Sequence, residues 1–245
     1  MSSVRLDKFL ADNGIGTRSK VRELIKKGLI KVNNDIVRKA DLKIDVQNDE
    51  IVYNGEKIEY QKYHYYILNK PADCITATTD SRAKTVMDIL NDVPYKNMFP
   101  VGRLDKDTEG LLLITDDGDL AHRLLSPKNH IDKTYFVKCS GIISDEDINV
   151  LENGVEIGDD KPTMPAKAVI TVSDPKKNSS ELLLTIREGR FHQIKRMIKA
   201  VGKTVTYLER IAFGSIKLDD SIKRGEYRRL SDDEIDELKS FSLQD

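Results

Sequence analysis

The stretch of sequence that decides the fold covers residues 101–118 and reads V-G-R-L-D-K-D-T-E-G-L-L-L-I-T-D-D-G. The apolar block after Gly110 has the composition of a fully buried strand, and an Asp-Asp-Gly turn closes it. Gly102 places a tight turn ahead of the charged residues. The stretch therefore predicts a charged loop at the mouth of a rigid strand, where a side chain can be positioned accurately.

Asp105 is the candidate catalytic residue of this loop, because it lies two residues after Arg103 and just ahead of the point where the chain turns inward. A partly buried carboxylate stays ionised at neutral pH when a cation lies beside it, and it can then act as a nucleophile or base. A solvated charged loop is the alternative interpretation. A metal site at Asp116, Asp117 and Asp119 is disfavoured, because their spacing differs from that of a calcium-binding loop.

The same stretch resembles the catalytic motif of the pseudouridine synthases of the RsuA type, from Gly102-Arg103-Leu104-Asp105 through Thr115-Asp116-Asp117-Gly118. Enzymes of that family isomerise uridine to pseudouridine in ribosomal RNA. The resemblance implies that Asp105 is the catalytic carboxylate and that Arg103 and Leu104 bind the substrate. It also implies that Arg103 occupies the gap left in an RNA helix by the extruded nucleotide; a salt bridge within the loop is the alternative role of Arg103.

A second motif, E-G-R-F-H-Q-I-K-R-M at residues 188–197, predicts a helix with an apolar face. Lys195 falls at the margin of that face, where a lysine can form a partly buried ion pair with a carboxylate. In the family that the sequence resembles, this position holds the basic residue that pairs with the catalytic aspartate. We also assign Arg190, His192 and Gln193 of this motif to substrate binding.

Three further positions match the family. Tyr135, in a strand predicted over residues 133–137, matches the residue whose ring packs on the target base and takes part in proton transfer; a core tyrosine is the alternative. Ile186, in a strand predicted over 182–186, matches an apolar residue of the uridine pocket. Lys70 belongs to the lysine-proline motif near the active site, and we assign it to the substrate site in a supporting role rather than a catalytic one.

The composition describes an ordinary globular protein of 245 residues, with 33% charged and 39% hydrophobic residues. No apolar run approaches the ~20 residues of a membrane span, and the N-terminus lacks the apolar core of a signal peptide, so we expect a cytoplasmic protein. Cys74 and Cys139 lie far apart without a CxxC pattern. They support neither a zinc site nor a disulfide framework.

The length favours two domains. Residues 54–63 are polar and lack helical periodicity, which predicts a linker at 59–63 between a domain of residues 1–58 and a catalytic domain of residues 64–245. The expected fold class is α+β. A small N-terminal α/β RNA-binding domain joins a catalytic domain built on a mixed, mainly antiparallel sheet.

The N-terminal domain carries the positive charge, since residues 1–43 hold 11 Lys and Arg against 5 Asp and Glu in a chain of net charge -1. Helices are predicted over 5–13 and 17–28, followed by strands around an Asn33-Asn34 turn. The second helix presents a basic ridge suited to a phosphate backbone, although a solvated helix face is the alternative.

This arrangement resembles the S-four-type RNA-binding domain, through R-L-D-K-F-L at residues 5–10 and K-V-N at residues 31–33. Such a domain binds mainly the shape and backbone of RNA. The residues assigned to RNA binding are Arg5, Lys8, Arg18, Ser19, Lys20, Arg22, Lys26 and Lys31.

The implied reaction adds and removes no atoms, so we expect neither a cofactor nor a metal. The expected partner of a monomeric enzyme is ribosomal RNA, with the small-subunit (16S) RNA favoured by Lys195, the short linker and the acidic tail. The alternatives are a large-subunit (23S) enzyme of the same family and a non-catalytic RNA-binding protein of ribosome assembly. A third alternative is a metal-dependent nuclease that uses Asp105, Asp107 and Asp116.

Overall fold

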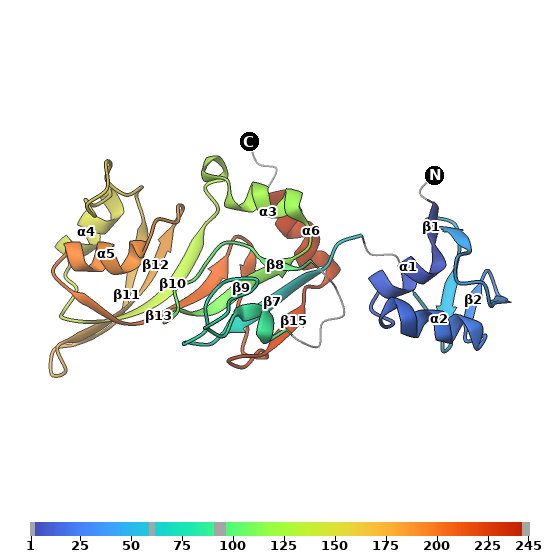
Figure 1. Cartoon of the computed structure of the whole chain (residues 1–245). Helices are drawn as coiled ribbons and strands as arrows, with labels where there is room; N and C mark the ends of the chain where they lie inside the picture. The colour runs from blue at the N-terminus through green and yellow to red at the C-terminus, as the bar shows by residue number, and fades with distance from the viewer. Residues whose placement is uncertain (1–2, 59–61, 91–96, 242–245) are drawn as a thin grey trace. The chain divides into compact units, whose positions relative to one another are not determined.

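The structure is a computed structural model that describes residues 3–58, 62–90 and 97–241 (Figure 1). The chain divides into two compact units, one of residues 1–64 with 90–98 and one of residues 65–89 with 99–245. Residues 59–61 of the predicted linker lie outside the described residues. No helix among the described residues combines the length and the apolar character needed to cross a lipid bilayer.

The N-terminal unit is built on two amphipathic helices that bury their apolar faces against short strands. Leu6, Phe9 and Leu10 of the first helix and Val21 and Ile25 of the second belong to one buried core. Thr17 caps the second helix, since its side chain accepts a hydrogen bond from the Lys20 backbone. The elements are β1 (Ser3–Arg5), α1 (Leu6–Asp12), α2 (Arg18–Lys26), β2 (Ile30–Val32), β3 (Asp35–Val37), β4 (Lys43–Asp45), β5 (Ile51–Tyr53) and β6 (Glu56–Lys57).

Both predicted helices and the turn at Asn33-Asn34 are confirmed, because β2 and β3 pair antiparallel on either side of it. Two features of this unit were not predicted. The predicted strand at 42–44 does not join that hairpin: β4 pairs with β1 in a separate two-stranded sheet. Residues 54 and 55 form the turn of a β5–β6 hairpin, so the polar stretch begins inside the domain.

The second unit is organised around a mixed sheet that the described residues form in the order β11-β12-β10-β13-β9-β7-β15. In addition, β14 pairs with β13, and β8 pairs with β9. Every pairing is antiparallel except that of β13 with β9, which confirms the mixed, mainly antiparallel catalytic domain. The strands are β7 (Tyr65–Lys70), β8 (Phe99–Pro100), β9 (Glu109–Thr115), β10 (Lys133–Ser140), β11 (Lys167–Asp174), β12 (Ser179–Ile186), β13 (Thr204–Phe213), β14 (Ile216–Lys217) and β15 (Tyr227–Arg229).

Figure 1 shows α4 and α5 beside the β11–β12 half of this sheet and α3 and α6 beside the half that contains β7 and β9. Residues 86–88 form a single 3-10 turn, whereas residues 118–125 and 145–153 form α-helices that Asp117 and Ser144 cap. The helical elements are η1 (Val86–Asp88), α3 (Gly118–Leu125), η2 (Pro127–Asn129), α4 (Asp145–Asn153), α5 (Gln193–Ala200) and α6 (Asp232–Phe241).

Candidate active site

The floor of the candidate site is one face of the three strands β12, β10 and β13. Tyr135 of β10 is paired directly with Arg210 of β13. Lys133, two residues earlier, is paired with Ile186 on one side and Phe213 on the other. Because paired residues point to the same face of an antiparallel sheet, these five side chains form two adjacent rows.

The loop that carries Asp105 lies at the start of β9, where β9 runs parallel to β13 and Gly110 is paired with Arg210. Gly110 has φ +97, and a Cβ atom there would lie 2.3 Å from the backbone oxygen of Arg210. Glycine is therefore required where the two strands meet. This close approach brings the loop over the floor of the site.

Lys70, at the end of β7, holds the loop from beneath. Its side chain is fully buried, and Nζ donates hydrogen bonds to the backbone oxygens of Asp105 (3.1 Å), Lys106 (3.2 Å) and Thr108 (2.8 Å). Burial lowers the pKa of Lys70. Lys70 is absent from the cavity lining and contacts the backbone of the loop, so its supporting role in the substrate site stays a prediction.

A second clamp acts on the residue before Asp105. The Thr76 hydroxyl donates to the Leu104 carbonyl at 2.8 Å and accepts from the Leu104 amide at 3.1 Å. Both polar backbone groups of Leu104 are thus satisfied by one buried side chain. The backbone on both sides of the Asp105 carboxylate is therefore fixed by side chains from distant segments.

The predicted ion pair between Asp105 and Lys195 is present, with 3.5 Å between Lys195 Nζ and Asp105 Oδ2. Lys195 also contacts Asp107 Oδ1 at 2.6 Å, and this hydrogen bond lowers the pKa of Asp107. His192 Nε2 lies 3.7 Å from the other oxygen of Asp105. The Asp105 side chain is 30% exposed, which agrees with the expectation of a partly buried carboxylate.

That cavity has a volume of about 1000 Å³, large enough for an extruded nucleotide. It is lined by both sequence motifs and by the strand face between them. Of the predicted residues, the lining includes Arg103, Leu104, Asp105, Tyr135, Ile186, Arg190, His192, Gln193 and Lys195. The structure therefore gathers on one cavity residues that are more than 90 positions apart in the chain.

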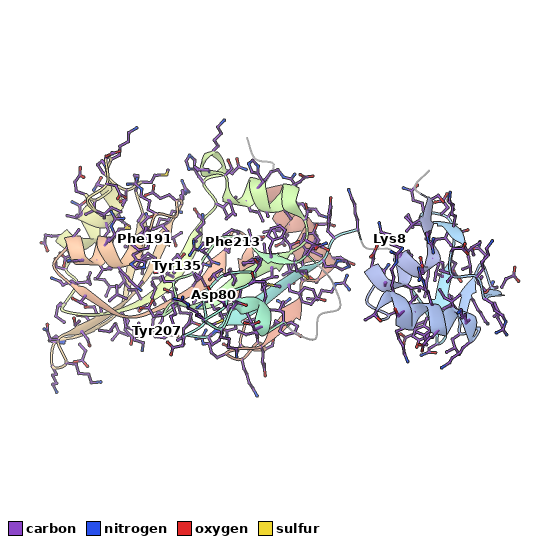
Figure 2. All side chains as sticks on the ribbon, in the orientation of Figure 1. Lys8, Asp80, Tyr135, Phe191, Tyr207 and Phe213 are labelled. Atoms are coloured by element: carbon purple, nitrogen blue, oxygen red, sulfur yellow. The ribbon has the colours of Figure 1, made fainter. Side chains whose placement is uncertain are left out.

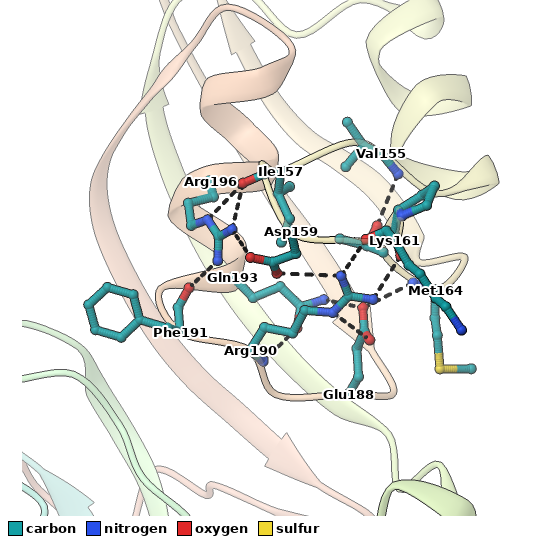
Figure 3. A network of polar contacts seen from close by, with 12 residues as sticks. Val155, Ile157, Asp159, Lys161, Met164, Glu188, Arg190, Phe191, Gln193 and Arg196 are labelled. Carbon is teal, nitrogen blue, oxygen red and sulfur yellow. Dashed lines mark hydrogen bonds and ion pairs between the residues drawn. The ribbon is translucent and has the colours of Figure 1, made fainter.

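Arg190 and Gln193 line the cavity, but their polar groups are used elsewhere (Figure 3). The Arg190 guanidinium donates to Glu188 at 3.0 Å, to the Lys161 carbonyl at 2.6 Å and to the Pro162 carbonyl at 2.7 Å. Gln193 donates to Glu188 at 2.9 Å and accepts from the Arg190 amide at 2.9 Å. These contacts order the turn before α5, and the assignment of both residues to substrate binding stays a prediction.

Sequence reasoning missed two cations on the floor. Burial, and secondarily the charge of Arg210, lower the pKa of Lys133 to about 8. Arg210 is only 2% exposed; its Nε donates to the Leu111 carbonyl at 2.8 Å, while its Nη2 has no hydrogen-bond partner. A buried guanidinium nitrogen without an acceptor is costly, and an oxygen atom of a bound ligand would satisfy it.

Sequence reasoning also assigned no role to Phe191, which lines the cavity and is 76% exposed. Figure 2 labels Phe191 in the same region of the second unit as Tyr135 and Phe213. The sequence signal for a role of Phe191 was its position between Arg190 and His192, in a motif rich in cations.

All eight residues assigned to RNA binding in the N-terminal unit are exposed. The unexpected feature is Asp7, whose fully buried carboxylate contacts Arg5 (2.9 Å), Arg22 (2.9 Å) and Arg18 (3.5 Å). Hydrogen bonds from Arg5, and then from Arg22, lower the pKa of Asp7 to about 2 against the opposing effect of burial. Three of the assigned arginines are therefore oriented by one carboxylate rather than being independent charges.

The carboxylates considered for a metal site have other contacts. Asp117 caps α3 through the Leu120 amide at 3.0 Å and accepts from the Tyr65 hydroxyl at 2.7 Å. Within the described part of the chain, no group of three or more His, Cys, Asp or Glu side chains is arranged to hold a metal ion.

Comparisons with known proteins agree with this geometry. The RNA pseudouridylate synthase family matches residues 64–200, and the S4 domain matches residues 4–51. The ribosomal large subunit pseudouridine synthase B of Bacillus subtilis is 39% identical over 97% of this chain and 96% of its own length. The ribosomal small subunit pseudouridine synthase A of Haemophilus influenzae is 38% identical over 96% and 99%. A crystal structure of a pseudouridylate synthase superposes with a TM-score of 0.67 at 37% identity, covering 96% of this chain and all of the other.

These matches identify the protein as a member of the class of RNA pseudouridine synthases. These enzymes are isomerases. The chain belongs to the RNA pseudouridylate synthase family and carries an N-terminal S4 domain. Over nearly its whole length it is similar to synthases named for either ribosomal subunit.

Proposed function

We propose that the protein isomerises a specific uridine of small-subunit ribosomal RNA, with Asp105 as the catalytic carboxylate. The observation that carries this proposal is the ion pair of Asp105 with Lys195 on the rim of a cavity of about 1000 Å³. The chemistry requires an ionised carboxylate, and this ion pair places the Lys195 ammonium beside the Asp105 carboxylate. We also propose that the enzyme acts as a monomer in the cytoplasm.

The reaction exchanges one glycosidic bond for another. The bond between the ribose anomeric carbon and N1 of uracil breaks, and the uracil turns within the cavity. The anomeric carbon then bonds to C5, the proton on C5 is removed, and N1 gains a proton. In our proposal Asp105 presents its carboxylate to the ribose, while Lys195 holds that carboxylate ionised.

The walls of the cavity have to retain the detached uracil and exclude water. Tyr135 and Ile186 are both buried and line the cavity from adjacent positions on β10 and β12. We propose that the Tyr135 ring packs on the uracil and that its hydroxyl takes part in removal of the C5 proton. Arg103 is exposed at the cavity mouth, where it can fill the space left in the RNA helix.

The uracil that leaves the ribose carries negative charge, shared between its ring nitrogen and carbonyl oxygens. Arg210 supplies a buried donor without a partner, and Lys133 lies beside it on the same strand face. Fixed cations in a site with little water stabilise such a charge strongly. We propose that Arg210, with support from Lys133, stabilises the detached base.

Sequence identity does not separate the two ribosomal subunits, because the large-subunit relative is 39% identical and the small-subunit relative 38% identical. The choice of small-subunit RNA therefore rests on Lys195 and on the acidic C-terminal residues. The test is chemical mapping of pseudouridine on both ribosomal RNAs from cells that lack the protein. We expect one pseudouridine to disappear from the small-subunit RNA and to return with the wild-type gene but not with D105N. Loss from the large-subunit RNA would favour the alternative, and no loss from either would contradict the proposal.

A further inference from the structure

Phe191 is a large apolar side chain held in solvent at the mouth of the active site. It is 76% exposed, the most exposed of the large hydrophobic residues described. It lines the same cavity as Asp105 and Lys195. An isolated exposed phenylalanine is ordinary on a protein surface, but its place on the rim of a catalytic cavity calls for a reason.

The backbone at Phe191 is held in position by a network of polar contacts. The Phe191 carbonyl accepts a hydrogen bond of 3.0 Å from Arg196. Arg196 is itself fixed, because it donates to the Ile157 carbonyl at 2.9 and 2.6 Å and forms an ion pair with Asp159. Figure 3 shows the Phe191 ring pointing away from this network.

His192 completes a two-ring unit with Phe191. The ring centroids are 3.8 Å apart, and the planes differ by 19°. His192 adopts a left-handed backbone conformation (φ +47), which a residue that is neither Gly nor Asn seldom occupies. This conformation turns the chain between β12 and α5 and allows the two neighbouring rings to stack.

The surroundings of this unit indicate the chemistry of its partner. Arg103, Lys106 and Arg187 line the same cavity as Phe191, so the lining of this cavity contains several cations. An apolar ring among cations suits a polyanion whose uncharged groups are flat and aromatic, which describes single-stranded RNA.

We propose that Phe191, backed by His192, is a stacking platform for the base of a nucleotide next to the target uridine. The target base has its own walls, Tyr135 and Ile186, which are buried inside the cavity. Phe191 lies outside them, where a neighbouring base loses its stacking partner when the uridine is extruded. The platform replaces that lost stacking. It deepens the proposed function, on which it rests, by assigning a site to a flanking nucleotide.

The test uses the absence of tryptophan from the chain. In F191W, the introduced indole is the only tryptophan and reports directly on stacking. The probes are a short oligouridylate and the same oligonucleotide with abasic residues on one or the other side of its central uridine. We expect the oligouridylate to quench the F191W fluorescence, and an abasic residue on one particular side to abolish the quenching.

Affinity measurements supply the second arm. We expect F191A to bind the oligouridylate about 5- to 100-fold more weakly than wild type, as removal of one stacked base does in other proteins. The affinity of wild type should fall by the same factor when the abasic oligonucleotide replaces the intact one. The affinity of F191A should not change with that replacement, because its stacking contact is already absent. F191Y should retain affinity. V169A is the matched control, because Val169 is 60% exposed and lies outside the cavity lining.

The platform would be overturned if F191A bound the abasic oligonucleotide more weakly than wild type by the same factor as it bound the intact one. It would also be overturned if F191A bound the intact oligonucleotide as tightly as wild type. Pseudouridine formation on ribosomal RNA is measured with the same proteins. If wild type is active and F191A binds the oligonucleotide normally, only the stacking proposal is wrong. If D105N is active, the proposed catalytic function is wrong.

Discussion

The buried ammonium group of Lys70 donates a hydrogen bond of 3.1 Å to the backbone carbonyl of Asp105. The same nitrogen contacts the carbonyls of Pro71, Lys106 and Thr108 at 2.8 to 3.2 Å. Four carbonyl dipoles thus converge on one cation, and the loop cannot move without leaving that cation unsatisfied in the interior. The position of Asp105 is set by a residue that is absent from the cavity lining.

We expect K70M to lower kcat about 100-fold with little change in RNA affinity, because a displacement of about 1 Å in a catalytic group costs that much. Single-turnover pseudouridine formation and RNA binding, measured on the same preparations, separate the two effects. K176M is the matched control, since Lys176 is exposed in the turn between β11 and β12 and lies outside the cavity lining. Equal kcat values for K70M and wild type would contradict the positioning role.

Asp7 gives the N-terminal unit a stability that depends on pH. Its pKa is about 2 in the folded protein, below the ordinary value of 3.8 that applies in the unfolded chain. The stabilisation is therefore complete above pH 4 and is lost as the pH falls toward 2. We expect D7N to destabilise this unit by about 1–2 kcal/mol at pH 7, after allowance for the solvent exposure of the arginines. Amide hydrogen exchange of α1 and α2 across this pH range measures the difference, and a difference that persists at pH 2 would argue against it.

Lys20 and Lys26 are exposed on α2, beside the arginines that Asp7 orients. If they contact phosphates, each contributes about 0.7–0.9 to the slope of log affinity against log salt concentration. We expect the double variant K20Q/K26Q to reduce that slope by about 1.5 units. The double variant K176Q/K177Q, in the exposed turn between β11 and β12, is the charge-matched control. A slope that is unchanged in K20Q/K26Q would show that the basic face of α2 does not bind the RNA backbone.

The sequence predicts the parts of the site that depend on local pattern and misses those that depend on sheet geometry. The strand after Gly110 and the helix that carries Lys195 are both visible from their periodicity. Arg210 and Phe213 are three residues apart and would lie on opposite faces of a regular strand. A bulge in the pairing of β10 with β13 places both side chains on the same face, with 5.2 Å between the Arg210 guanidinium carbon and the centroid of the Phe213 ring. No local pattern in residues 204–213 predicts this shift in strand register.

The same limit applies to charges. The sequence suggested that Lys195 pairs with Asp105, but the structure shares Lys195 with Asp107, and the shorter contact is to Asp107. The separation of these residues in the chain contains no information on which carboxylate lies closer. Lys70 followed an expected strand, yet its complete burial depends on loops contributed by residues 104–108.

Substitution of the two carboxylates separately tests that sharing. We expect D105N to bind RNA with unchanged affinity and to form no detectable pseudouridine, since an amide is neither a nucleophile nor a base. D107N should lower kcat less than about 10-fold, because Lys195 then remains available to Asp105. Pseudouridine formation under saturating RNA measures both. Equal losses in the two variants would mean that the carboxylates act as a unit.

Arg210 offers the most direct test of electrostatic stabilisation at the floor of the site. Its unpartnered Nη2 needs an acceptor, and the detached uracil supplies carbonyl oxygens that become more negative as the glycosidic bond breaks. We expect R210M to lower kcat by about 100- to 1,000-fold, the usual cost of one preorganised donor, while RNA affinity changes less than about threefold. R210K should recover part of the rate, because the positive charge remains without the planar pair of donors. Thermal unfolding of both variants establishes that the β10–β13 pairing is intact. If folded R210M bound RNA much more weakly but kept its single-turnover rate, Arg210 would be a binding residue for the ground state and the stabilising role would be wrong.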